Sequence, residues 1–274
     1  MTLLLQVSDP HIIDVGRILE DRVDTAANLS AAIGMIDSAT AKPDLLLLTG
    51  DLVNNGRDSE YEHLAELLRP VTIRMLPVMG NHDDRQLMRD YLDMPPNSGS
   101  GEEPCHYVVD LQEQWGPTRI IVLDTTEPGR HGGLLCAERL SWLDNRLSEA
   151  PDRSTIVVQH HPPIESGIGF MDRYGLVGSL EEAEILAANP QVVSVLAGHL
   201  HRPIYGSSGG RGVVVAPSCA AQVALDLGGG RTAYTEEPGM VAWHRWNGSH
   251  FVSHHTPVGS SHHWVPEWAQ APLS

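Results

Sequence analysis

Short apolar runs alternate with amphipathic segments through the first two-thirds of the chain. Runs such as Leu45-Leu46-Leu47-Leu48 are apolar on both faces, as strands buried on both sides are. The segments between them carry apolar residues at helical spacing, for example Leu29, Ile33 and Ile36. The predicted strands are 3–7, 44–49, 73–79, 106–111, 119–124, 154–159 and 192–197, and the predicted helices are 24–39, 58–68, 85–92, 137–148 and 179–188.

The end of the chain has a different pattern. Residues 213–215, 240–246 and 251–255 predict antiparallel β structure. A chain that is α/β in its first two-thirds and β-rich at its end favours two sheets packed face to face with helices outside. No repeat or linker divides the chain, so we expect residues 1–274 to form one domain. Within it, about 220–274 is expected to be a β-rich segment that caps the site or forms a subunit interface, because it carries Trp243, Trp246, Trp264 and Trp268.

Composition narrows the class of protein. With 274 residues, of which 41% are hydrophobic, the chain can bury a substantial core. No apolar run approaches the roughly 20 residues of a membrane span, and the N-terminus resembles a strand more than a signal peptide. Three widely spaced cysteines, Cys105, Cys136 and Cys219, argue against a disulfide framework. We therefore expect a cytoplasmic protein without membrane contact.

The chain is strongly acidic, with a formal net charge of -17. It lacks the basic surface that long nucleic acids normally require, so we expect no such partner. A small anionic substrate is still compatible with this charge, because bound metal dications reverse the local field.

Side chains that bind metals follow five of the predicted strands. Carboxylate oxygen and imidazole nitrogen suit zinc, manganese and iron, with cobalt as a further candidate. A strand-end turn or a turn closed by its own Asp or Asn side chain explains any one of these residues alone, but five groups in this order favour a metal centre. The candidate ligands are Asp9, His11, Asp51, Asn81, His160, His199 and His201.

The charges of these residues suit two ions. Asp51 can bridge two ions with its two oxygens, and ions roughly 3.5–4 Å apart can share a bridging hydroxide. Asn81 adds a neutral amide oxygen. Two dications, the carboxylates of Asp9 and Asp51, and one hydroxide leave a net charge of about plus one, which attracts a phosphodiester and stabilises the charge that develops during attack.

The motifs as a set resemble the calcineurin-like metallophosphoesterase superfamily. The longer strings, Gly50-Asp51-Leu52-Val53-Asn54, Gly80-Asn81-His82-Asp83-Asp84 and His160-His161-Pro162-Pro163, are similar to bacterial class III cyclic nucleotide phosphodiesterases and the related glycerophosphodiesterases. The resemblance runs from residue 3 to about 225. Pro10 stands where this group commonly has Thr, at a position that contributes no ligand.

The resemblance implies a four-layer αββα sandwich and a role for each site residue. It implies that Asp9, His11 and His201 hold the first metal, and that Asn81, His160 and His199 hold the second. Asp51 would bridge the two ions. His82 would face the scissile phosphate, where it would stabilise the transition state or protonate the leaving alkoxide. The resemblance also favours a homodimer or a higher homo-oligomer.

The expected activity is hydrolysis of small phosphodiesters, either cyclic nucleotides or glycerophosphodiesters. A phosphomonoesterase or a phosphonate monoester hydrolase on the same site is the alternative. A non-enzymatic scaffold of this fold is disfavoured, because all seven ligands and His82 are present.

Several neighbouring residues have simpler interpretations. His161 is expected to be structural, and Asp83 and Asp84 to cap the following helix. A substrate contact by Asn54, Asn55 or Arg57 is left open. The roles of loops 94–104 and 163–178 are left open; within the second loop, the glycine-rich segment 164–172 could act as a lid, a specificity loop or a dimer contact. The late histidines, expected at the surface or an interface, are His250, His254, His255, His262 and His263.

Overall fold

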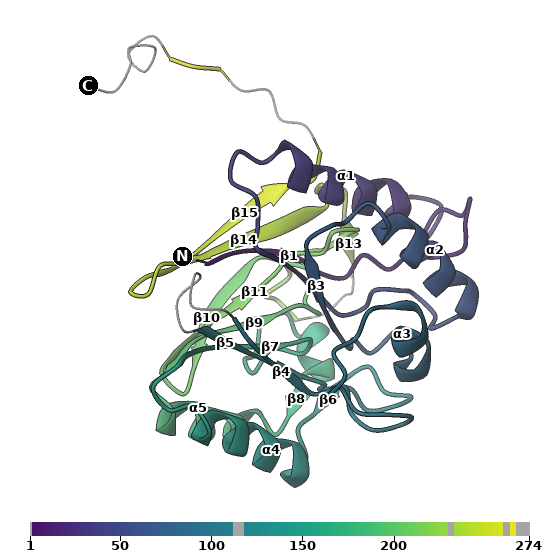
Figure 1. The fold of residues 1–274 in the computed structure, drawn as a ribbon. Coiled ribbons are helices and arrows are strands. Elements are labelled where there is room, and N and C mark those ends of the chain that lie inside the picture. Colours follow the sequence, from purple (N-terminus) through teal and green to yellow (C-terminus); the bar gives the residue numbers. More distant parts are fainter. Residues whose placement is uncertain (1, 112–117, 230–232, 260–263, 267–274) are drawn as a thin grey trace.

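Two mixed β-sheets form the centre of the structure, a computed structural model that describes residues 2–111, 118–229, 233–259 and 264–266 (Figure 1). The first sheet has the strand order β15-β14-β1-β2-β3, and the second has the order β10-β11-β9-β7-β5-β4. The strands of the first sheet are β1 (Thr2–Val7), β2 (Leu45–Thr49), β3 (Arg74–Val78), β14 (Met240–Trp246) and β15 (Phe251–Pro257).

The remaining elements lie in and around the second sheet. Its strands are β4 (Tyr107–Asp110), β5 (Thr118–Leu123), β7 (Ser154–Gln159), β9 (Val192–Ala197), β10 (Ile204–Ser208) and β11 (Arg211–Val215). The helices are α1 (Thr25–Ser38), α2 (Asp58–Leu68), α3 (Arg85–Tyr91), α4 (Ala137–Ser148) and α5 (Ser179–Ala188). The short elements are β6 (Gly133–Leu134), β8 (Leu176–Val177), β12 (Gln222–Val223), β13 (Tyr234–Thr235) and a 3-10 helix (Met171–Tyr174).

Three hydrophobic cores separate four layers. Along β2, Leu45 and Leu47 face the core between the sheets, while Leu46 and Leu48 face the core beneath α1, α2 and α3. A third core lies between the second sheet and helices α4 and α5, and includes Leu143 and Leu186. The alternation of β2 follows from the two-residue period of a strand. The predicted αββα sandwich is therefore confirmed.

The C-terminal β-rich segment contributes directly to the first sheet. β14 pairs antiparallel with β1, and β15 pairs antiparallel with β14. Within β14, Trp246 is buried and Trp243 packs against the core beneath α1. Within this segment the short β12–β13 pair stands apart from the two large sheets. Trp264 is 81% exposed, and Trp268 lies outside the described residues.

The start of α5 differs from what its local sequence suggests. Ser179 and Glu182 have the spacing of a capping box, but the N-cap is Gly178, whose φ of 90° favours glycine. Ser179 is instead the first helical residue. Glu182 points into the interior, where Gln159 Nε2 donates a hydrogen bond of 3.2 Å to its Oε2. Burial raises the pKa of Glu182 to about 8.

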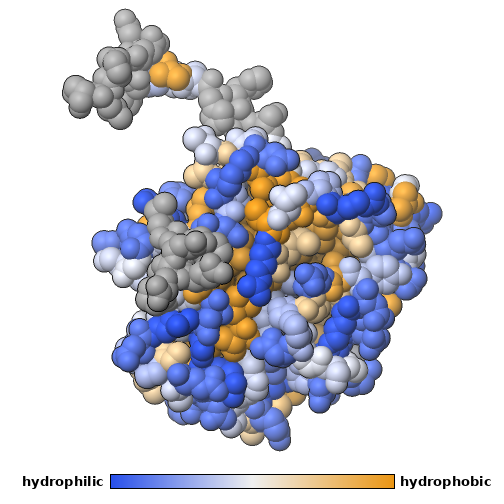
Figure 2. All heavy atoms as spheres, viewed as in Figure 1, coloured by the Kyte–Doolittle hydropathy of each residue, from blue (hydrophilic) through white to orange (hydrophobic). Residues whose placement is uncertain are grey.

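Hydrophilic residues cover most of the face seen in Figure 2, and an apolar band crosses its middle. None of the described helices is long and apolar enough to cross a membrane. The three cysteines are free thiols. His250 and His254 are exposed and His255 is half-buried, whereas His262 and His263 lie outside the described residues.

A buried ion pair connects the two halves of the sandwich. Arg85 Nε, on α3, lies 2.7 Å from Oδ2 of Asp124, which follows β5 in the other half. The Arg85 guanidinium also donates to the carbonyl oxygen of Thr126 at 3.1 Å. Both charged side chains are buried, so each depends on the other for charge compensation.

Replacing Arg85 with methionine is expected to lower the free energy of unfolding by about 3–5 kcal/mol, because the Asp124 carboxylate stays buried without its cation. Arg130→Met is the matched control, since the Arg130 side chain is 71% exposed beside Glu127 and such pairs contribute less than about 1 kcal/mol. Urea denaturation of the two variants measures both values. Equal destabilisation would contradict a special role for the buried pair.

Candidate metal centre

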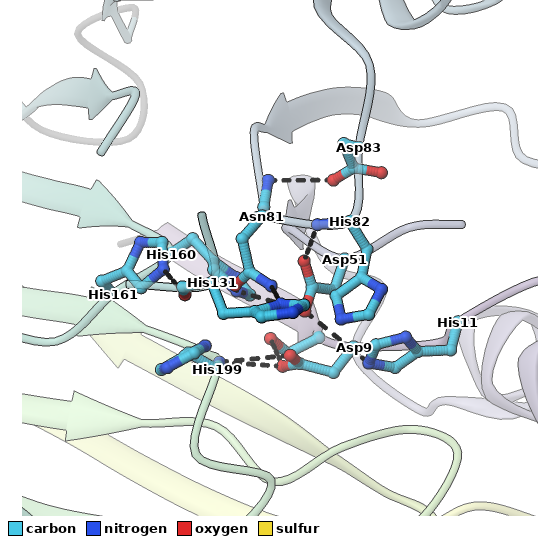
Figure 3. Close-up of polar contacts among 12 residues, drawn as sticks. Asp9, His11, Asp51, Asn81, His82, Asp83, His131, His160, His161 and His199 are labelled. Carbon is cyan, nitrogen blue, oxygen red and sulfur yellow. Dashed lines mark hydrogen bonds and ion pairs between the residues drawn. The ribbon is translucent and has the colours of Figure 1, made fainter. Parts of the chain in front are cut away.

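The site lies where the carboxyl ends of parallel strands from both sheets meet (Figure 3). β1, β2 and β3 run parallel and end just before Asp9, Asp51 and Asn81 respectively. In the second sheet, β7 and β9 run parallel and end before His160 and His199. All seven predicted ligands are therefore brought to one region.

The backbone turns sharply at most of these positions. Five of the seven residues have a positive φ, which is costly for a residue other than glycine. Strain of this kind persists where the surrounding structure enforces it and is typical of functional sites. The five are Asp9 (51°), His11 (45°), Asp51 (50°), His199 (69°) and His201 (50°).

One group of side chains consists of Asp9, His11, Asp51 and His201. One ligand atom from each lies within 4.8 Å of the others, and all four residues are buried. The Nε2 atoms of His11 and His201 are only 3.1 Å apart, and His201 Nε2 is 3.3 Å from Asp9 Oδ1. His201 donates from Nδ1 to the Ala221 carbonyl oxygen, so its Nε2 is left to face the group. Two imidazole nitrogens and carboxylate oxygens converging in this way fit a divalent cation.

A second group forms around His160. Its Nε2 lies 3.2 Å from Asn81 Oδ1 and 3.4 Å from Asp51 Oδ2. Its Nδ1 donates to the Thr49 carbonyl oxygen at 2.9 Å, which fixes the ring. The His199 ring centroid is 5.1 Å from that of His160, and its Nε2 donates to the Tyr174 carbonyl oxygen. The Nδ1 of His199 is thus the atom available to this group.

Asp51 stands between the two groups. Its Oδ2 is 3.4 Å from His160 Nε2 and 3.7 Å from His11 Nε2. Burial opposes ionisation, but the positive charge of His160 and nearby histidines holds the pKa of Asp51 well below its usual value. Burial lowers the pKa of His11 to about 3, which leaves its imidazole neutral. An ionised Asp51 and a neutral His11 suit metal binding, whereas the Asp51 carboxylate, against the effect of burial, raises the pKa of His160 to about 9, so an ion would have to displace that proton.

His82 lies at the edge of both groups. Its backbone N–H donates to Asp51 Oδ1 at 2.9 Å, and its Nδ1 donates to the Asn54 carbonyl oxygen at 2.7 Å. Because Nδ1 carries the proton in that bond, Nε2 is left free for a ligand. Its ring centroid is 4.9 Å from that of His11. A role for His82 beside a substrate phosphate stays a prediction.

The two acidic residues after His82 have different roles. Asp84 caps α3, since its Oδ1 accepts a hydrogen bond from the Leu87 N–H, as predicted. The same prediction is wrong for Asp83. Its half-buried carboxylate accepts from the N–H groups of Gly80, Leu52 and Val53, and so ties the loop after β2 to the loop after β3. Burial raises the pKa of Asp83 to about 7.

His161 is close to the second group, yet both of its ring nitrogens are already engaged. Nδ1 is 2.8 Å from Thr125 Oγ1, and Nε2 donates to the carbonyl oxygen of His131 at 3.0 Å. His161, His160 and His199 are near enough together to approach one ion. We nevertheless favour the predicted structural role, because a ligand nitrogen needs a free lone pair.

Two residues at the site were missed by the sequence analysis. His131, in the loop before β6, has its Nδ1 3.4 Å from Asn81 Nδ2 and its ring centroid 5.6 Å from that of His82. Tyr234, on β13, has its ring centroid 6.0 Å from that of His201. Neither follows one of the predicted strands in a recognisable motif, so the sequence gives no signal for them.

The residues and loops whose contact with substrate was left open form hydrogen bonds and ion pairs mainly with other parts of the protein. Asn54 contributes its carbonyl oxygen to His82. Asn55 Nδ2 donates to Glu60 Oε1 at 2.6 Å, and Arg57 pairs with Asp14 at 3.7 Å. Loop 94–104 is fixed to α3 through Arg89, which donates to the carbonyl oxygens of Ser98 and Glu103. Loop 163–178, in contrast, reaches the site through the Tyr174 carbonyl oxygen.

Comparison with known proteins identifies the class. Residues 2–203 match the calcineurin-like phosphoesterase family, and the chain belongs to that family, which implies a divalent metal centre. It is 33% identical over 257 residues to a probable glycerophosphodiester phosphodiesterase of Arcobacter nitrofigilis, covering 93% of this chain and 92% of the relative. It is also 33% identical over 224 residues to a probable cyclic nucleotide phosphodiesterase of Rhodopseudomonas palustris, covering 81% and 79%.

A solved structure agrees at the level of the fold. The crystal structure of a dimetal phosphatase from Danio rerio matches with a TM-score of 0.58 and 14% identity, over 88% of this chain and 95% of that one. The resemblance predicted from the motifs is thus confirmed, both for the superfamily and for the phosphodiesterase group within it.

Proposed function

We propose that this protein is a two-metal phosphodiesterase that hydrolyses small phosphodiesters, with cyclic nucleotides and glycerophosphodiesters as candidate substrates. The observation that carries the proposal is the placement of Asp51 between two groups of potential ligands. Asp9, His11 and His201 would hold one ion, and Asn81, His160 and His199 the other. The names of the relatives support small phosphodiesters as the substrate class.

The metals would supply Lewis acidity and would lower the pKa of water to about 7, which provides hydroxide near neutral pH. The protein contributes the arrangement around them. Asp51 keeps the two groups adjacent, and Asp83 fixes the two loops that carry Asp51 and Asn81. His82 presents Nε2 at the edge of the site, and with a second proton on that nitrogen it would donate to the leaving alkoxide or stabilise charge on the phosphate.

Removal of the metals is expected to abolish hydrolysis of bis(p-nitrophenyl) phosphate, because the remaining groups cannot generate hydroxide at neutral pH. Added manganese, zinc, iron or cobalt should restore activity, and comparison of the four tests which ions the mixed nitrogen and oxygen ligands prefer. Release of p-nitrophenol measures turnover, and elemental analysis counts the ions. Activity that survives complete metal removal would contradict the mechanism.

A kinetic panel tests the substrate class. The panel contains 3′,5′-cyclic AMP, 2′,3′-cyclic AMP, glycerophosphoethanolamine and p-nitrophenyl phosphate, compared by kcat/KM. At least one diester is expected to be hydrolysed more efficiently than p-nitrophenyl phosphate. A clear preference for the monoester over all three diesters would overturn the proposal in favour of a phosphomonoesterase.

We also propose that the protein is a single domain, forms a homodimer or a higher homo-oligomer, and works in a reducing cytoplasm. The buried free thiols of Cys105 and Cys219 support the last point. Light scattering coupled to size-exclusion chromatography measures the oligomeric state. A monomer at micromolar concentration would contradict that part of the proposal.

A further inference from the structure

Three rings form a continuous row that leads away from His82. The His131 ring lies beside His82, with 5.6 Å between the ring centroids. The Tyr174 ring is 5.6 Å from His131, and the Phe170 ring is 5.4 Å from Tyr174. We call His131, Tyr174 and Phe170 the aromatic row. It begins at the group that we expect to face the substrate phosphate.

Hydrogen bonds to backbone carbonyls and packing place the row against the site. The Tyr174 carbonyl oxygen accepts the hydrogen bond from His199 Nε2 at 3.1 Å, so its backbone is fixed to a proposed metal ligand. The backbone of His131 is held in place, because its carbonyl oxygen accepts a hydrogen bond from His161 Nε2. Phe170 packs against the core beneath the second sheet. A preorganised aromatic surface of this kind binds a planar group without having to order itself first.

The rings keep part of their surface available to a ligand. His131 is exposed, and Tyr174 and Phe170 are each half-buried. The guanidinium of Arg173 lies 5.2 Å from the Phe170 ring centroid. A cation already sits over that ring, which disfavours a cationic alcohol group such as choline at the same place.

We propose that the aromatic row binds the base of a cyclic nucleotide, so that cyclic nucleotides are preferred over glycerophosphodiesters. The inference rests on the proposed phosphodiesterase function. Nucleobases stack on aromatic side chains with little dependence on sequence, because every base has a π-face. The row starts with His131 next to His82 and continues through Tyr174 to Phe170. A nucleotide whose phosphate lies beside His82 would therefore place its base against these rings. The alcohols of glycerophosphodiesters have no planar group to offer.

The unmodified manganese-loaded protein provides the first test. We expect kcat/KM for 3′,5′-cyclic AMP to exceed that for its base-free analogue, 1-deoxyribose 3′,5′-cyclic phosphate, by about tenfold, the effect of stacking one base. Glycerophosphocholine should be poorer than cyclic AMP. Equal efficiency for cyclic AMP and the base-free analogue, or a preference for glycerophosphocholine, would overturn the inference.

Variants locate the effect on the row. Phe170→Leu and Tyr174→Leu should each lower kcat/KM for cyclic AMP severalfold, mainly through KM, and leave the base-free analogue within about twofold, because only the base stacks on these rings. Tyr174→Phe, which keeps the ring, should behave like the unmodified protein. Phe251→Leu is the matched control, since Phe251 pairs with Trp246 at the end of the first sheet opposite the site. Equal losses on both substrates would indicate a merely structural role.

Equilibrium binding provides a measurement that does not depend on turnover. By calorimetry, AMP is expected to bind the manganese-loaded protein about tenfold more tightly than ribose 5-phosphate, and Tyr174→Leu should reduce that difference. If no diester is hydrolysed, the proposed function fails and this comparison still decides whether the row binds a base. If diesters are hydrolysed without any preference for a base, the inference alone fails.

Discussion

Asp51→Ala is expected to lower kcat/KM for phosphodiesters by about a thousandfold or more and to reduce the metal content from two ions to at most one. Its Oδ2 is the oxygen shared by the two groups, 3.4 Å from His160 Nε2 and 3.7 Å from His11 Nε2. Loss of a two-metal arrangement removes several kcal/mol of transition-state stabilisation, and about 4 kcal/mol corresponds to roughly a thousandfold. Elemental analysis and steady-state kinetics measure the two effects.

Two further variants make this result specific. Asp51→Asn keeps the volume of the side chain and an oxygen that can accept the His82 N–H, but it loses the charge, so it should also be strongly impaired. Asp144→Ala removes an exposed carboxylate on α4 and should leave activity and metal content unchanged. Two ions at full occupancy in Asp51→Ala would show that Asp51 does not bridge the metals.

His82→Ala is expected to reduce kcat by about 10²–10⁴ while both ions stay bound, the range typical of a positioned acid. The expectation follows from the hydrogen bonds of His82. Its backbone N–H donates to Asp51 and its Nδ1 donates to the Asn54 carbonyl oxygen, which leaves Nε2 to contact the substrate. The backbone contact survives the substitution, so the metal groups should remain intact. Metal analysis separates the catalytic effect from loss of the centre, and the exposed His250 offers a control for histidine removal.

The leaving group distinguishes the two roles suggested for His82. If Nε2 protonates the leaving oxygen, the loss should be larger for cyclic AMP, whose alkoxide needs a proton, than for bis(p-nitrophenyl) phosphate, whose phenolate leaves easily. A similar loss on both substrates would instead favour stabilisation of charge on the phosphate. Loss of an ion in His82→Ala would make His82 a metal ligand.

The sequence predicts the sandwich well because its main elements depend on local periodicity. Leu45 to Leu48 predict a strand buried on both faces, and Leu29, Ile33 and Ile36 predict the buried face of α1. The proposed ligands could be located for a related reason. Each follows a strand, and the carboxyl ends of parallel strands in a sheet reach the same edge.

The remaining features depend on contacts between distant segments. Glu182 has the spacing of a cap residue, but a buried partner, Gln159, draws it inward. β10 contains Gly206, Ser207 and Ser208, which have no strand pattern, and forms a strand by pairing with β11. His131 is brought to the site by His161 and not by any motif of its own. Local patterns carry no information about such partners.

The ligands of each proposed ion come from both sheets. Asp9 and His11 follow β1 of the first sheet, and His201 follows β9 of the second. The other group likewise combines Asn81 with His160 and His199. Each ion would therefore act as a cross-link across the seam of the sandwich. An ion at a hundred times its dissociation constant stabilises the folded state by about 2.7 kcal/mol, so the metals that enable hydrolysis would also hold the two sheets together, and metal starvation would weaken the fold and the activity at once.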